Sequence, residues 1–323
     1  MDAPEHTELR QVVVRSALMT GVERLRPLIR RHVDELLAEL ARLPQPVDLV
    51  ERFTLALPVR VICDLFGVPI EDRKVFERCA VIVARRSAPG IEVAAAYASL
   101  TEYLGRLVDA KNEKPADDLV SELVVKHYRT GRITKGQVIG LGLPLLTGGH
   151  ATTAHQLALS VVSLLRNREQ VSLLADPASV PALVDELLRH LTVVHFGLRR
   201  VAVEDIAVGA TVIRAGEGVV LALQSANRDP AVFPDPERLD PTRGSRGHVA
   251  FGYGAHRCPG QGLARAELEI ALPALFHSLP GLRPAVPFEK ITFEEDSLLY
   301  GVRDLPVLWD PPPGASDCGK RSE

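Results

Sequence analysis

The sequence predicts a mainly α-helical protein, and three features of the chain support this class. The first is a long apolar stretch with helical periodicity over residues 134–167. The second is a series of amphipathic stretches that fill most of the chain before residue 199. The third is that strand-like runs are short and lie almost entirely after that position. We therefore expect mostly helices, with a small β component in the second half.

Apolar residues at helical spacing predict the helices in chain order. The first helix begins near Pro4 and places His6 and Arg10 four residues apart on one face. Further helices are expected over residues 24–43, 47–67, 72–86, 91–112, 117–128, 134–167, 182–189 and 263–279.

Proline and glycine mark irregular points in two of these helices. Pro58 should break the helix over residues 47–67, and Gly67 should end it. In the long helix, Pro144 and the adjacent glycines Gly148 and Gly149 predict a bend or a local widening. Both expectations concern backbone geometry that the structure can test.

The β component is expected in two regions of the second half. Residues 199–209 and 211–221 form short strands around turns, and residues 291–309 form a final pair. Between them, prolines in residues 227–240 resist both helix and sheet and predict an extended loop.

Composition limits the possible partners and location. The chain has 323 residues, 46% of them hydrophobic, and a formal net charge of −3, which argues against a nucleic-acid partner. No apolar run is long enough to span a bilayer, no signal peptide is evident, and the four cysteines form no CxxC pair. We expect a cytoplasmic protein with free thiols, no membrane contact, one domain over residues 1–310 and a disordered tail over residues 311–323.

A glycine-rich segment around Cys258 is the strongest candidate for a functional site. Residues 251–260 contain three glycines, Gly252, Gly254 and Gly260, which permit tight turns and close approach to a ligand. A predicted helix follows, so the cysteine lies near a helix N-terminus, where an ionised sulfur is favoured. The alternative is a buried, inert cysteine.

The spacing of Phe251, Gly254, Cys258 and Gly260, with His256 two residues before the cysteine, resembles the haem-thiolate signature of the cytochrome P450 family. The resemblance covers residues 5–309 and looks closest to soluble bacterial members. It implies the fold of that family, a helical bundle around a long central helix with small β-sheets. It also implies that the N-terminal portion, which carries a small sheet and part of the roof of the substrate pocket, is missing.

The resemblance implies haem b as cofactor, with the Cys258 thiolate as axial ligand of the iron. A thiolate ligand increases electron density on iron and favours O–O cleavage. Basic side chains would bind the haem propionates. The residues implied to bind the cofactor are His6, Arg10, Arg200, Phe251, Gly252, His256, Cys258 and Gly260.

Residues in the long helix match the oxygen-binding motif of the same family. Gly149 would open a groove for O₂, and the hydroxyls of Thr152 and Thr153 stand where a proton-relaying alcohol is expected. Ala151 occupies the position of the usual acid and cannot relay a proton. The alternative for the two threonines is a hydrogen bond to a carbonyl one turn earlier.

Glu186 and Arg189 are three residues apart on one helix face, which alone indicates a common surface ion pair. With Arg238 they match a buried Glu-Arg-Arg triad of the family, a structural network in which each charge needs the others.

Pro259 follows the cysteine and removes one possible N–H donor to the sulfur. Fewer hydrogen bonds should lower the haem potential. A proline also simply suits the first turn of a helix, and the two explanations are compatible.

The resemblance implies a haem-thiolate monooxygenase that inserts one oxygen atom of O₂ into a small apolar organic substrate by hydroxylation or epoxidation. It also implies a monomer of secondary metabolism that receives electrons from NAD(P)H through ferredoxin reductase and ferredoxin. A cluster of arginines near the cysteine would attract an acidic ferredoxin, or would simply be a solvated face. This cluster comprises Arg243, Arg246, Arg257 and Arg265. The alternative function is a haem-binding fragment without monooxygenase activity.

Overall fold

The computed structural model describes residues 2–16, 21–244 and 247–311. The predicted tail over residues 311–323 lies outside the described residues except for Pro311. The helices are α1 (Glu5–Val14), α3 (Val22–Leu40), α4 (Ala56–Phe66), α5 (Arg73–Ala84), α6 (Gly90–Glu113), α7 (Leu119–Leu123), α8 (Lys135–Arg166), α9 (Val180–Leu191), α10 (Leu223–Ala226) and α11 (Gln261–Ser278). The mainly α-helical class is confirmed.

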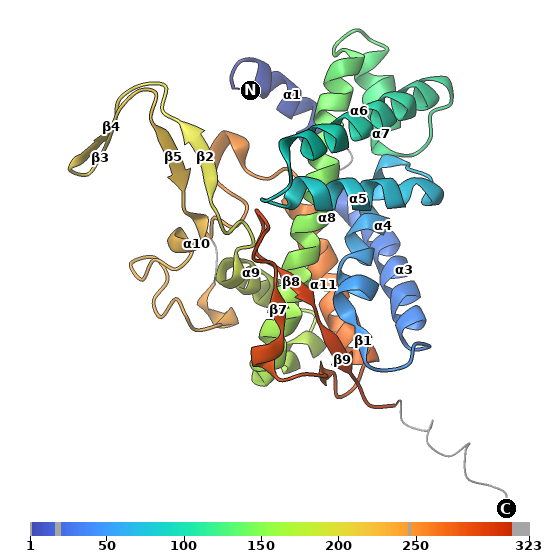
Figure 1. Cartoon of the computed structure of the whole chain (residues 1–323), viewed down its shortest axis with the longest axis vertical. Coiled ribbons are helices and arrows are strands. Elements are labelled where there is room, and N and C mark those ends of the chain that lie inside the picture. The colour runs from blue at the N-terminus through green and yellow to red at the C-terminus, as the bar shows by residue number, and fades with distance from the viewer. Residues whose placement is uncertain (1, 17–20, 245–246, 312–323) are drawn as a thin grey trace, which may run out of the picture.

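Helix α8 forms over the long apolar stretch, as predicted, and runs through the centre of the molecule, as the family resemblance implied (Figure 1). It begins with a capping box, in which Thr134 Oγ1 accepts from the Gln137 N–H at 3.2 Å and the Gln137 side chain accepts from the Thr134 N–H at 2.9 Å. Packing against α4, α6 and α11 surrounds the helix with other helices. The helix stays α-helical through Pro144, so no widened turn forms there.

The predicted helix over residues 47–67 is interrupted, but at Leu55, three residues before Pro58. Residues 47–67 form a two-residue strand, a single wide turn over Val50–Thr54, and then α4, which starts at Ala56. Pro58 therefore lies in the first helical turn, where its missing N–H would have no partner inside the helix. The predicted end is confirmed, because Gly67 adopts a left-handed conformation with φ +70°.

The strands form four small antiparallel sheets within the described residues. Strand β9 pairs with β1 and β6, β2 with β5, β3 with β4, and β7 with β8. Their bounds are β1 (Val47–Asp48), β2 (Leu198–Val201), β3 (Ile206–Val208), β4 (Thr211–Ile213), β5 (Gly218–Leu221), β6 (Arg283–Pro284), β7 (Thr292–Phe293), β8 (Val302–Asp304) and β9 (Pro306–Leu308).

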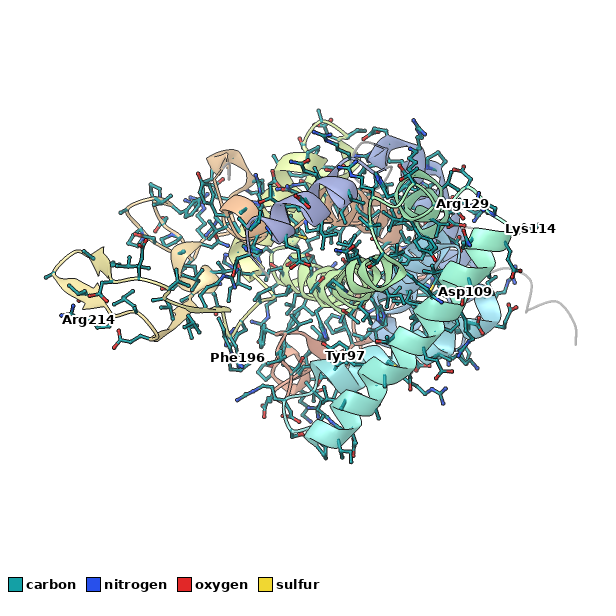
Figure 2. The ribbon with its side chains drawn as sticks, turned by 90° about the horizontal axis from the view of Figure 1, so that it is seen from above. Tyr97, Asp109, Lys114, Arg129, Phe196 and Arg214 are labelled. Atoms are coloured by element: carbon teal, nitrogen blue, oxygen red, sulfur yellow. The ribbon has the colours of Figure 1, made fainter. Side chains whose placement is uncertain are left out.

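Strands β2 to β5 form an arm that projects from the helical body (Figure 1). From above, Arg214 lies at the far end of this arm and Phe196 near its base, while α6 crosses the opposite side of the molecule (Figure 2). No helix in the described part of the chain is long and apolar enough to cross a membrane.

Candidate active site

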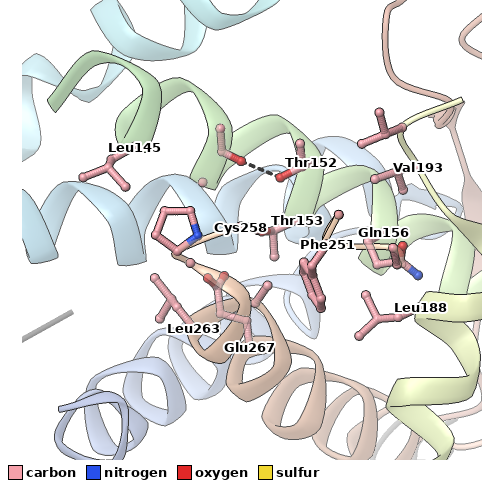
Figure 3. Close-up of a pocket in the computed structure, with 18 of the residues that line it drawn as sticks. Leu145, Thr152, Thr153, Gln156, Leu188, Val193, Phe251, Cys258, Leu263 and Glu267 are labelled. Atoms are coloured by element: carbon pink, nitrogen blue, oxygen red, sulfur yellow. Dashed lines mark hydrogen bonds between the residues drawn. The ribbon is translucent and has the colours of Figure 1, made fainter. Parts of the chain in front are cut away.

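A cavity of about 280 Å³ lies between α8 and α11, and its lining is mostly apolar (Figure 3). Residues from α8, α11, the segment after α9, and the cysteine loop (residues 251–260) form its walls. Cys258 reaches it from the loop before α11, and Thr152 reaches it from α8. The cavity therefore has a sulfur on the wall formed by the loop before α11 and a hydroxyl on the wall formed by α8.

The cysteine loop closes on itself through backbone hydrogen bonds. The Cys258 N–H donates to the Phe251 carbonyl at 2.8 Å, and the Gly252 N–H donates to the Val249 carbonyl at 2.8 Å. Gly252 and Gly254 have φ values of +71° and +73°, a region that side chains rarely adopt. The positive φ values therefore explain why the motif has glycine at positions 252 and 254.

The groups around the Cys258 thiol shift its pKa in opposite directions. Burial raises its pKa, while the Gly260 N–H and the nearby guanidinium groups of Arg10, Arg265 and Arg257 lower it. Burial is the larger influence, so the helix N-terminus does not by itself keep the sulfur ionised. A metal cation bound to the sulfur would favour the thiolate directly.

Two histidines from distant parts of the sequence meet at one edge of this cavity. The rings of His6 and His256 lie 4.0 Å apart, and His256 Nε2 lies 3.2 Å from Asp2 Oδ1. The Arg10 guanidinium donates to the Arg257 carbonyl in the cysteine loop. Arg200 is not brought into this group, because it is exposed on β2 and donates to the Arg199 carbonyl at 2.8 Å.

The α8 wall contains Gly148, Gly149, Thr152 and Thr153. The Thr152 hydroxyl donates to the Gly148 carbonyl, so the back-bonded alternative is the conformation present (Figure 3). A Cβ on Gly149 would lie 3.0 Å from Ile62 Cδ1 of α4. A side chain at position 149 would therefore press against α4, and glycine avoids this contact.

Glu267 was missed by the sequence interpretation, although it lines the cavity from α11. The residue is 2% exposed, its Oε2 has no hydrogen-bond partner among the described residues, and burial raises its pKa to about 8. The available signal was an acid on the apolar face of a predicted helix, between Leu263 and Ile270. Burial therefore favours the uncharged acid.

The predicted triad has the wrong third member. Glu186 and Arg189 form a fully buried pair with contacts of 2.7 and 2.8 Å, but the Arg238 side chain is exposed. Arg238 contributes only its carbonyl, 3.3 Å from Arg189 Nη2. The second guanidinium belongs to Arg243, whose Nε lies 3.4 Å from Glu186 Oε1.

The geometry of the loop before Arg243 explains this exchange. The Arg243 guanidinium donates to the carbonyls of Pro234, Asp235 and Arg238, so it fills the inside of the turn that these residues form. A sequence with two arginines five residues apart does not indicate which one points inward. The folded loop does.

The arginine cluster near the cysteine is not a uniform surface patch. Arg243 forms an ion pair with Glu186. Arg265 forms an ion pair with Asp185 at 2.7 Å, and its guanidinium lies 4.7 Å from the centre of the Phe251 ring. Arg257 is exposed, and Arg246 lies outside the described residues. Of the four, Arg257 alone is a described and exposed candidate for contact with a partner.

These features fit a haem. In the described part of the chain, no three His, Cys, Asp or Glu side chains gather around a point that could hold a metal ion. An iron bound to Cys258 would therefore need its other ligands from a cofactor. An apolar slot with one sulfur on its wall and basic groups at one edge suits an apolar macrocycle with anionic substituents.

Comparison with known proteins supports the same assignment. The sequence pattern of the cytochrome P450 family matches residues 178–284. The chain is 47% identical over 311 residues to cytochrome P450-SU2 of Streptomyces griseolus, covering 96% of this chain and 76% of that protein. It is 45% identical to pentalenic acid synthase of Streptomyces avermitilis, covering 96% and 77%.

A solved structure of cytochrome P450 TxtC, described as catalysing thaxtomin hydroxylation, superposes with a TM-score of 0.91 at 42% identity, covering 96% of this chain and 81% of that chain. The sequence, the fold and the cavity therefore all indicate the same family. The chain belongs to the cytochrome P450 family, whose members hold haem through a cysteine thiolate and act as monooxygenases with O₂ as co-substrate.

Proposed function

We propose that Cys258 is the axial haem ligand and that this chain inserts one oxygen atom from O₂ into a small apolar organic molecule, by hydroxylation or epoxidation. The observation that carries the proposal is the position of Cys258 and Thr152 on different walls of one apolar cavity. Bound haem would supply the oxidising chemistry. The protein's own residues would hold the substrate and exclude water.

The basic edge of the cavity would hold the haem propionates. His6, Arg10 and His256 meet there and offer cationic or donor groups to carboxylates. Arg200 would need to turn from the Arg199 carbonyl to join them. Phe251, Gly252 and Gly260 would contact the macrocycle from the cysteine loop, since all three line the cavity.

Thr152 would hold a proton near the oxygen-binding face. Its hydroxyl hydrogen is bonded to the Gly148 carbonyl, so the hydroxyl oxygen keeps its acceptor capacity toward the cavity. Thr153 also lines the cavity and offers a second hydroxyl. Because Ala151 has no carboxyl, protons would have to reach Thr152 through water or substrate.

The substrate class follows from the apolar lining. Leu145, Leu188, Val193 and Val194 line the cavity and offer no charge to a ligand. The similarity to pentalenic acid synthase and to the thaxtomin hydroxylase supports a role in secondary metabolism.

Electrons would come from NAD(P)H through ferredoxin reductase and an acidic ferredoxin. Exposed Arg257, next to Cys258 in the sequence, would provide a positive contact at the surface. Reduction by ferredoxin should slow as salt rises, and Arg257→Glu should slow it at low salt. A reduction rate independent of salt would contradict this docking site.

The decisive test uses the full chain with bound haem, ferredoxin, its reductase and NADPH. Product formation from an apolar substrate, with one oxygen atom from ¹⁸O₂, would support the proposal. A reduced carbon monoxide spectrum typical of thiolate ligation without any product would instead indicate a haem-binding fragment. Cys258→Ser should lose the thiolate spectrum in either case.

A further inference from the structure

Asn227 is a fully buried side chain that forms hydrogen bonds to two chain segments, and each segment continues directly into a wall of the cavity. It caps the end of α10, its exposed fraction is 0%, and both ends of its amide are used. Oδ1 accepts from the Val249 N–H at 2.7 Å, and Nδ2 donates to Thr192 Oγ1 at 2.8 Å. A backbone N–H can only donate, so the amide orientation is fixed by Val249.

The first contact leads to the cysteine. Val249 is held by Asn227 through its N–H, and its carbonyl accepts from the Gly252 N–H at 2.8 Å. The Phe251 carbonyl then accepts from the Cys258 N–H at 2.8 Å. Asn227 therefore fixes the start of the loop that presents the sulfur.

The second contact leads to the other side of the cavity. Thr192 ends α9 with φ +34°, a left-handed conformation that is unfavourable for a β-branched residue. Its hydroxyl donates to the Arg189 carbonyl at 2.9 Å and so accepts from Asn227. Val193 and Val194, which follow immediately, line the cavity.

The buried Glu186–Arg189 ion pair also contacts the backbone of Asn227. Arg189 Nη1 donates to the Asn227 carbonyl at 2.8 Å, while the same guanidinium binds Glu186. The backbone of Asn227 is therefore fixed on one side and its side chain on two others. Such a residue can transmit position but cannot itself take part in the chemistry.

We propose that Asn227 is a positioning residue that couples the cysteine loop to the Val193–Val194 wall. Its two hydrogen bonds would keep the distance between these two parts of the cavity wall constant. The proposal rests on Cys258 as haem ligand. Loss of the Val249 contact should affect the ligation of the sulfur. Loss of the Thr192 contact should affect only the wall that faces a bound ligand.

The test uses the full chain with bound haem and two spectroscopic readouts. The reduced carbon monoxide difference spectrum reports the thiolate-ligated fraction, and titration with 4-phenylimidazole reports binding against the wall. Asn227→Ala should lower the thiolate-ligated fraction and raise the Kd of 4-phenylimidazole roughly two- to tenfold, as expected for one net hydrogen bond. Thr192→Val should raise the Kd by a similar factor and leave the thiolate-ligated fraction unchanged.

Two controls separate positioning from general destabilisation. Thr192→Ser keeps the hydroxyl and should behave as the unsubstituted chain in both readouts. Asn167→Ala removes another amide, which donates to the Ser163 carbonyl at 2.8 Å at the end of α8. It should lower Tm without changing either spectrum.

The proposal is overturned if Asn227→Ala lowers Tm as Asn167→Ala does and changes neither readout. It is also overturned if Thr192→Val and Thr192→Ser bind 4-phenylimidazole equally, a comparison that remains available if Asn227→Ala does not fold. A thiolate spectrum that persists in Cys258→Ser would instead contradict the ligand assignment.

Discussion

Replacing Arg243 by alanine should destabilise this protein far more than replacing Arg238, although the two arginines are only five residues apart. The Arg243 side chain is 9% exposed and contacts the Glu186 carboxylate and the carbonyls of three loop residues. Hydrogen bonds to a charged group contribute about 1.5–3 kcal/mol each, and neighbouring bonds of one group are not additive. Glu186 keeps its two contacts with Arg189 in the variant, so no buried charge is left alone.

We therefore expect Arg243→Ala to cost about 2–4 kcal/mol of unfolding free energy. At about 2.1 cal/mol/K per residue, 323 residues give an unfolding entropy of about 0.7 kcal/mol/K. The corresponding fall in Tm is about 3–6 °C. Arg238→Ala removes an exposed side chain and keeps the carbonyl that accepts from Arg189, so its Tm should change by less than about 1 °C.

The assay is thermal unfolding of both variants, followed by circular dichroism on protein with the same haem content. Equal losses in Tm, or a larger loss for Arg238→Ala, would refute the assignment of Arg243 to the buried network. Arg243→Lys is a useful third variant, because lysine keeps the charge but cannot match the fork of the guanidinium.

Three further predictions concern the cavity and its walls. Glu267 has its folded pKa raised by burial from 4.5 to about 8, so the stability it contributes is full below pH 4.5 and is lost as pH rises toward 8. Glu267→Gln should remove this part of the dependence of Tm on pH, and an unchanged Tm profile would show that the carboxyl ionises freely. Gly149→Ala should be about 1–3 kcal/mol less stable than Gly148→Ala, because both gain the helix propensity of alanine but only the Cβ at position 149 would meet Ile62. Equal Tm values for the two glycine variants would contradict the packing argument. Pro259→Leu adds an N–H beside the sulfur, which already accepts from Gly260, and should raise the haem potential. A potential that stays the same in a redox titration would mean that the proline serves only the helix turn.

Local sequence determined those features that depend on a few neighbouring residues. The apolar spacing over residues 134–167 was sufficient to predict α8, because helix periodicity is a local property. Gly67 ends α4 as predicted for the same reason, since only glycine adopts its φ of +70° without strain. The motif around Cys258 likewise predicted a tight loop before a helix, and the family followed from it.

Other features depended on which segments meet in space, and only the tertiary structure decided them. His6 and His256 are 250 residues apart in sequence, and residue spacing cannot say that their rings lie 4.0 Å from each other. Either Arg238 or Arg243 could supply a guanidinium to the buried Glu186–Arg189 pair. The fold of the loop directs only the Arg243 side chain to Glu186. Asn227 appeared in the sequence as one residue of an irregular loop. Its role became visible only when folding brought Thr192 and Val249 to opposite ends of its amide, because a hydrogen bond requires proximity that sequence order does not specify.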